Sequence, residues 1–156
     1  MEETFSVIGW PLIILYIAIG SLLAAGSMSI SQRIFAPKTE QIFYGLFLIP
    51  IAGLYLAFAA YFRVDTAWIL ESEGLLVFAT IGLLGIRFPA VLILGYPLHG
   101  VWDILHELQA HGGFSMFDPG QATAIPFAYG IFCAAYDFCM AAYFYTRRSE
   151  WKTGGY

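Results

Sequence analysis

Residues 96–107 read YPLHGVWDILHE and place four ionisable side chains inside a long apolar run. A helix advances about 100° per residue, so residues three, four and seven apart share a face. His99, Asp103 and His106 therefore point one way, and Glu107 lies at the edge of the same face. Each charged group near the middle of a bilayer costs about 2.5–3.5 kcal/mol on insertion scales. We therefore expect this stripe to have partners: a metal, a hydrogen-bonded network or a water-filled cavity.

The composition around this stretch indicates a membrane protein. The chain has 156 residues, of which 60% are hydrophobic and 12% are charged, whereas soluble chains carry about 25% charge. Its apolar runs recur at lengths that can cross a bilayer, and its net charge of −4 argues against nucleic acid as a partner. We predict an all-α integral membrane bundle forming one domain, residues 1–156. Its five predicted spans are residues 5–28, 41–62, 66–86, 89–108 and 123–145.

The positive charges predict the orientation of this bundle. With five spans the two termini lie on opposite sides of the membrane, and lysine and arginine favour the cytoplasmic side. One side has only Arg63. The sequence therefore predicts an outside N-terminus, a cytoplasmic C-terminus and a multi-pass location in a bacterial inner membrane. The other side collects Arg33, Lys38, Arg87, Arg147, Arg148 and Lys152.

Three features predict how the spans pack. Gly20 and Ala24 form a small-xxx-small pair, which lets another helix approach closely. The second span is aliphatic and aromatic all round, which suits a lipid-facing helix. The link at residues 87–88 is very short, so the third and fourth spans should form an antiparallel hairpin.

The depths of the acidic side chains predict which spans meet through polar contacts. Glu71 and Glu73 lie about 7–10 Å inside the outer plane at a rise of about 1.5 Å per residue. Residues two apart face different directions on a helix, so at most one of them faces the interior. The depth order predicts two levels of polar contact: Glu71 or Glu73 with Asp103 and His106, and Asp137 with His99.

Imidazole and carboxylate groups at these positions are ligand types that zinc and iron use. The candidate metal ligands are His99, Asp103, His106 and Asp137. The two histidines lie about 10.5 Å apart along the helix axis, so one ion bound by both would need the two side chains stretched toward each other. We favour Asp103 shared with one histidine as the core, completed by Asp137 or Glu71. The other histidine then supports a ligand or binds a second ion.

A metal-dependent hydrolase is the first functional hypothesis. Glu71 or Glu107 would be the general base to a metal-bound water, and the substrate would be a lipid or another apolar molecule entering from the outer leaflet. For Glu107 there is a second interpretation. Glu107 and His111 would form a water-exposed pair at the membrane interface, and such a pair usually has no function beyond being solvated.

A non-enzymatic role is the alternative. Polar residues hold transmembrane helices together through hydrogen bonds, and His99–Asp137 and His106–Glu71 pairs would satisfy these groups without chemistry. The stripe could equally hold a pigment, haem or quinone in a small-molecule binder, or belong to a subunit of an oligomer or complex. A proton path along the stripe ranks last, because the inner halves of the first four spans look dry.

The same residues carry a resemblance to a known family. The run HGVWDILHE at residues 99–107, then Pro126 and CAAYD at residues 133–137, resembles a family of small, uncharacterised bacterial integral membrane proteins. Its members show H-x-x-W-D-x-x-H-H, a proline after that span and C-x-x-x-D in the last helix. The resemblance covers about residues 90–142, and Glu107 departs from it by replacing the second histidine of the pair. It supports the choice of residues and implies no particular reaction.

Overall fold

The computed structural model describes residues 2–153, with side chains from residue 9 onward. Met1 and residues 154–156 of the predicted domain lie outside the described residues. The described chain is all-helical and has no strand, which confirms the all-α part of the predicted fold class. A short 3-10 turn, η1 (Asp65–Ala67), precedes the third helix. The five long helices are α1 (Glu2–Ile34), α2 (Pro37–Phe62), α3 (Trp68–Gly85), α4 (Pro89–His111) and α5 (Tyr129–Thr153).

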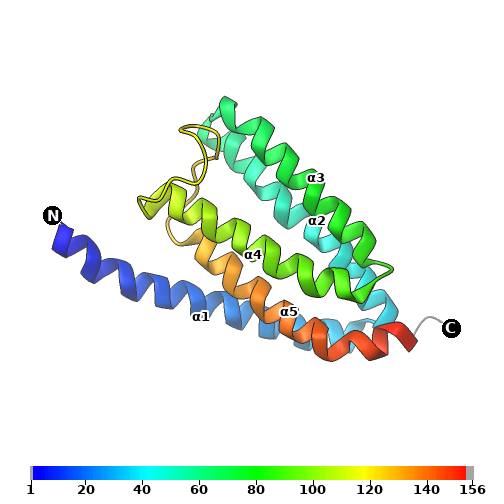
Figure 1. Cartoon of the computed structure of the whole chain (residues 1–156). Coiled ribbons are helices and arrows are strands. Elements are labelled where there is room, and N and C mark those ends of the chain that lie inside the picture. The colour runs from blue at the N-terminus through cyan, green and yellow to red at the C-terminus, as the bar shows by residue number, and fades with distance from the viewer. Residues whose placement is uncertain (1, 154–156) are drawn as a thin grey trace.

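Successive helices run in opposite directions, so α1 begins and α5 ends at opposite ends of the bundle (Figure 1). α5 packs between α4 and α1, and α3 packs between α2 and α4, with α1 on the outside. The ends of the helices therefore gather into two groups. Arg63 lies at the end where α2 stops. The opposite end, which we call the basic end, carries Arg33, Lys38, Arg87, Arg147, Arg148 and Lys152.

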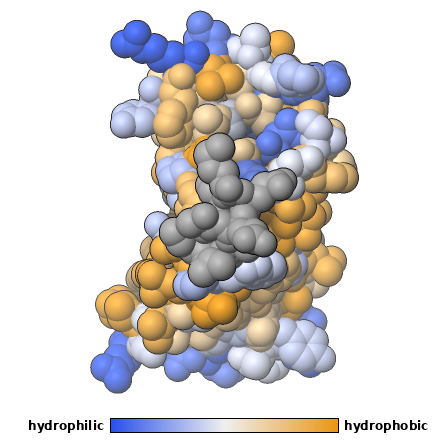
Figure 2. Space-filling model, turned by 90° about the vertical axis from the view of Figure 1, so that its left-hand side faces the viewer, coloured by the Kyte–Doolittle hydropathy of each residue, from blue (hydrophilic) through white to orange (hydrophobic). Residues whose placement is uncertain are grey.

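Within the part of the chain that the structure describes, three helices are long and apolar enough to cross a membrane: residues Gly9–Ile34, Pro37–Phe62 and Asp65–Gly85. Many of their large apolar side chains are exposed, among them Leu22 and Leu76. A contiguous exposed apolar surface of this kind marks a membrane or protein interface. In Figure 2 hydrophilic residues gather at the top and the bottom of the molecule, with hydrophobic ones between them. This distribution is consistent with a lipid bilayer around the bundle.

The helix ends differ from the predicted span limits where the backbone interrupts or prolongs a helix. α1 continues to Ile34, well past residue 28. α5 begins at Tyr129 rather than at Thr123. Pro126 disfavours a helical residue before it, and Ala128 has a φ of 59°, a left-handed conformation in which a helix does not continue. The last helix is therefore preceded by a non-helical segment that folds over the end of α4.

α2 exposes only one of its faces, although its composition is apolar all round. One of its faces is buried along the whole helix, and only the other is exposed. The residues of the buried face recur every three or four positions, which is the spacing of one helix face, and most of them are aromatic or small. Its members beyond the first turn are Tyr44, Gly45, Leu48, Ala52, Tyr55 and Ala59.

Small residues set the distance between α1 and α5, as the small-xxx-small pair predicts. A Cβ atom placed on Gly20 would lie 2.3 Å from the backbone oxygen of Phe132 in α5. Ala24, one turn further on, is fully buried. Any larger residue at Gly20 must therefore push the two helices apart.

Replacing Gly20 with valine is expected to destabilise the protein by about 1–3 kcal/mol, because the added side chain overpacks the α1–α5 contact. Denaturant unfolding of the purified protein in detergent measures the loss. The matched control is Gly26→Val on the same helix, because nothing lies within 4 Å of a Cβ atom at Gly26. Equal losses for the two variants would contradict this account of the contact.

Candidate metal site

His99, Asp103 and Asp137 form a buried group between α4 and α5. His99 Nδ1 lies 2.7 Å from Asp137 Oδ2 and 3.2 Å from Asp103 Oδ2. All three side chains are almost fully buried, with exposed fractions of 2%, 0% and 1% in chain order. The ligand atoms of the three residues lie within 4.8 Å of one another. The contact of His99 with Asp137 is the one that the depths of the two residues predict.

Two glycines let α4 and α5 approach closely enough for this group to form. A Cβ atom on Gly130 of α5 would lie 2.3 Å from the backbone oxygen of Asp103. On α4, a Cβ atom at Gly100 would lie 3.3 Å from the Cα atom of Ala134. The backbones of the two helices are thus nearly in contact on both sides of the polar group.

Tyr55 is a member of the site that the sequence interpretation missed. Its hydroxyl group donates a hydrogen bond to Asp103 Oδ1 over 2.5 Å, and its side chain is 1% exposed. Tyr55 comes from α2, so a third helix reaches the site. The regular spacing of the buried face of α2 is the signal that could have found it, because Tyr55 falls on that face.

Polar atoms of the group remain without hydrogen-bond partners. His99 Nε2, Asp103 Oδ2 and Asp137 Oδ1 are buried and make no hydrogen bond. Buried polar atoms are normally satisfied, and each exception needs an explanation such as an ion or a water. One imidazole and two carboxylates form a set of nitrogen and oxygen donors that zinc and iron accept. The group has the composition and spacing of a metal site with three protein ligands.

His106 lies outside this group and pairs with Glu71. Its Nε2 atom lies 3.2 Å from Glu71 Oε1, and its Nδ1 atom lies 3.0 Å from the backbone oxygen of Trp102. Glu71 Oε1 also accepts from the backbone N–H of Thr123. Glu73 is exposed, so only one of the two glutamates faces the interior, as predicted.

Glu107 caps the last helix instead of forming a wet pair with His111. Its carboxylate accepts the backbone N–H groups of Ala128 over 2.7 Å and Gly130 over 3.0 Å. Only 6% of the residue is exposed, because the segment before α5 folds over it. The His111 ring contacts the backbone oxygen of Ile125 over 3.0 Å. The expectation of a solvated Glu107–His111 pair is therefore wrong.

The two glutamates proposed as general bases have contacts of their own. Glu71 is bound to His106 and to the segment before α5, and both oxygens of Glu107 bind backbone amides. Neither belongs to the group of His99, Asp103 and Asp137. Their catalytic role stays a prediction, and the contacts they make hold helices and loops in place.

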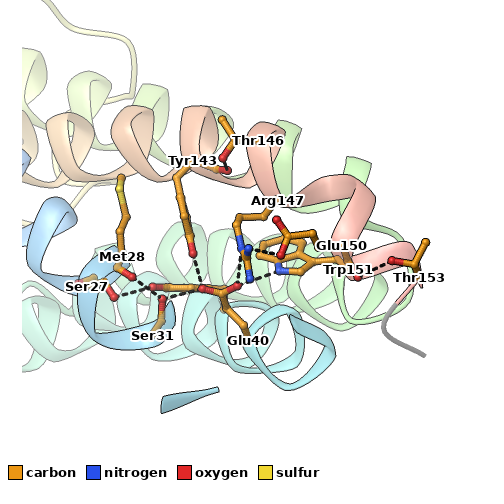
Figure 3. A network of polar contacts seen from close by, with 11 residues as sticks. Ser27, Met28, Ser31, Glu40, Tyr143, Thr146, Arg147, Glu150, Trp151 and Thr153 are labelled. Atoms are coloured by element: carbon orange, nitrogen blue, oxygen red, sulfur yellow. Dashed lines mark hydrogen bonds and ion pairs between the residues drawn. The ribbon is translucent and has the colours of Figure 1, made fainter. Parts of the chain in front are cut away.

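A second buried carboxylate network lies at the basic end and was not predicted. Glu40 is fully buried at the start of α2. Its Oε1 atom accepts from the hydroxyl groups of Ser31, over 2.7 Å, and Tyr143. Its Oε2 atom accepts from Arg147 Nε and Trp151 Nε1, both over 3.0 Å (Figure 3). This network joins the end of α1, the start of α2 and the end of α5.

No family model, curated protein or solved structure matches this chain. The resemblance to the bacterial membrane family therefore rests on its two sequence blocks alone.

Replacing Glu107 with glutamine is expected to cost about 1–3 kcal/mol of stability, because an amide nitrogen cannot accept and leaves one buried N–H group unpaired. Denaturant unfolding in detergent, followed by circular dichroism, measures the change. Glu73→Gln is the control, since substitutions at exposed positions stay within about 0.5 kcal/mol. A Glu107→Gln variant as stable as this control would refute the capping role.

Proposed function

We propose that the chain is a five-crossing membrane protein that binds a divalent metal ion, zinc or iron, between α4 and α5. The observation that carries this proposal is the group of His99, Asp103 and Asp137, whose ligand atoms lie within 4.8 Å of one another. His106, the fourth predicted ligand, pairs with Glu71 and holds α4 against α3.

The charge of the group supports a cation. An ionised carboxylate that leaves water for an apolar interior loses several kcal/mol unless it is paired. One imidazole can compensate at most one of the two aspartates, while Asp103 Oδ2 and Asp137 Oδ1 have no hydrogen-bond partner. A divalent ion compensates both carboxylates and uses these atoms.

The number of ligands supports a reactive site rather than a closed structural one. Structural zinc sites take four protein ligands, whereas catalytic sites take three and leave a position for water or substrate. A bound metal lowers the pKa of water to about 7, so hydroxide becomes available at neutral pH. Metal-dependent hydrolysis of an apolar substrate is the reaction that this arrangement favours.

A purely structural polar cluster is the second candidate. It is favoured by the contact of His99 with Asp137 and by that of His106 with Glu71, which tie α4 to two neighbours without an ion. The two candidates differ in the metal content of the purified protein. A bound pigment, haem or quinone would instead give the purified protein a visible absorbance band.

The membrane orientation is part of the proposal. α4 and α5 cross beside the three apolar helices, and the basic end lies in the cytoplasm by the positive-inside rule. The N-terminus is then outside, and the segment before α5 lies on the outer side together with Arg63. We place the protein in the inner membrane of a bacterium.

Purified protein is expected to contain about one zinc or iron ion per chain, and His99→Ala to lower this content about tenfold or more by removing a ligand. Elemental analysis by plasma mass spectrometry measures the content. His106→Ala is the matched control, because it removes a buried histidine of the same helix outside the group. Asp103→Asn tests the same site if His99→Ala does not fold. Metal content that is negligible in the parent protein, or equal in His99→Ala and His106→Ala, would leave the structural candidate.

Single cysteines test the orientation. In a background with Cys133→Ala and Cys139→Ala, Ser115→Cys should react with a membrane-impermeant maleimide in intact cells, because Ser115 is exposed beyond the outer end of α4. Ser149→Cys, exposed at the basic end, should react only after the membrane is permeabilised. The reverse pattern would show the opposite orientation, and equal labelling of both would rule out a fixed one.

A further inference from the structure

A cavity of about 290 Å³ lies beside the candidate metal site, between α1, α2 and α5. Its lining includes the imidazole of His99 and the carboxyl group of Asp137, together with the weaker polar groups of Ser27, Tyr129, Cys133 and Tyr136. Most of the wall is aliphatic or aromatic. The main apolar contributors are Leu23, Phe47, Ile51, Leu54 and Phe132.

The cavity connects the lipid-facing surface with the buried polar group. Leu23 of α1 and Leu54 of α2 are 51% and 41% exposed, so the rim that they form faces the surroundings of the bundle. His99 and Asp137, at 2% and 1%, form its buried end. The cavity therefore runs from an apolar entrance at the surface to a polar end inside.

The entrance exists because α1 packs against α5 and is separated from α2 along most of the length of α1. α1 meets α5 closely at Gly20. Its contacts with α2 gather toward the basic end, where Tyr44 donates to the backbone oxygen of Ser27 and Ser31 donates to Glu40. Away from that end the two helices diverge (Figure 1). A lateral opening between α1 and α2 follows from this arrangement.

We propose that this cavity binds a single-chain membrane amphiphile with a hydroxyl head group, which enters sideways from the bilayer between α1 and α2. The apolar wall accepts the chain, and the polar end accepts the head. The volume lies at the lower limit of small-molecule pockets, about 300–1,000 Å³, so it takes one chain rather than a two-chain phospholipid.

In the metal-free protein, the unpartnered atoms of His99 and Asp137 select the hydroxyl group. Asp137 Oδ1 lacks a hydrogen-bond partner and, as a carboxylate oxygen, requires a donor. A hydroxyl group can donate to it, whereas a carboxylate head would face a like charge without water to screen it. His99 Nε2, which is also free, can accept or donate according to its tautomer. A long-chain alcohol therefore suits the cavity better than a fatty acid of equal length.

This site goes beyond metal binding and does not require the ion. An ion on His99, Asp103 and Asp137 would leave a position that the same hydroxyl oxygen could take. The binding is therefore measured on chelator-treated and on metal-loaded protein separately. In the chelator-treated protein only the cavity and its hydrogen bonds act on the ligand.

Photolabelling of the full-length protein in phosphatidylcholine vesicles tests the proposal. The probe is a long-chain primary alcohol with a diazirine next to its hydroxyl end. We expect the label on the cavity-facing residues of α5, read by peptide mass spectrometry, because the head lies deep. Leu23→Trp fills the entrance and should reduce this labelling about tenfold. Leu22→Trp is the matched control, since Leu22 is the neighbouring residue, is 71% exposed and does not line the cavity.

A second probe tests the head group. A fatty acid with the same chain and diazirine should label chelator-treated protein about tenfold less than the alcohol does. Asp137→Asn, which removes the negative charge, should narrow this difference. Equal labelling of the Leu22→Trp and Leu23→Trp variants, labels confined to lipid-facing positions such as Leu76, or equal labelling by the two probes would overturn the proposal. Alcohol labelling of a protein that contains no metal as purified, before any chelator is added, would reject metal binding and keep the cavity. Metal in the purified protein without cavity labelling would do the opposite.

Discussion

The contact between His99 Nδ1 and Asp137 Oδ2 is the interaction on which the rest of the site depends. It joins α4 to α5 at 2.7 Å, and Asp103, held by Tyr55 of α2, shares the same ring nitrogen. In a bilayer such groups find no water, so each must keep its partner or leave an uncompensated buried charge. One imidazole therefore determines how far three helices can slide or turn relative to one another.

Polar groups and small residues cooperate in this arrangement. The side chains of His99 and Asp137 meet only because Gly100 and Gly130 let the two backbones come nearly into contact. The same rule operates between α1 and α5 at Gly20, where no polar group is involved. The glycines allow the helix backbones to approach closely, and the hydrogen bonds determine how α4 is aligned along α5.

Much of the fold and part of the site could be predicted, for identifiable reasons. Apolar runs and short links indicate five antiparallel helices, and the constant rise of a helix places Glu71 level with His106, as the structure confirms. Tyr55 was not predicted as a site residue because an aromatic residue in an apolar span is typical of core packing. Its role depends on which face of α2 points into the bundle. The capping role of Glu107 was not predicted because helical periodicity does not indicate where an irregular segment such as residues 123–128 folds.

The Glu40 network has a consequence for how the chain is made. Arg147 lies 107 residues after Glu40, and Trp151 lies 111 residues after it. During synthesis the first helices leave the ribosome long before either partner exists, so this carboxylate lacks two of its hydrogen-bond donors until translation is almost finished. Arrival of the final helix would then draw α1 and α2 together around it. Biogenesis of the bundle is in this sense completed from its C-terminal end.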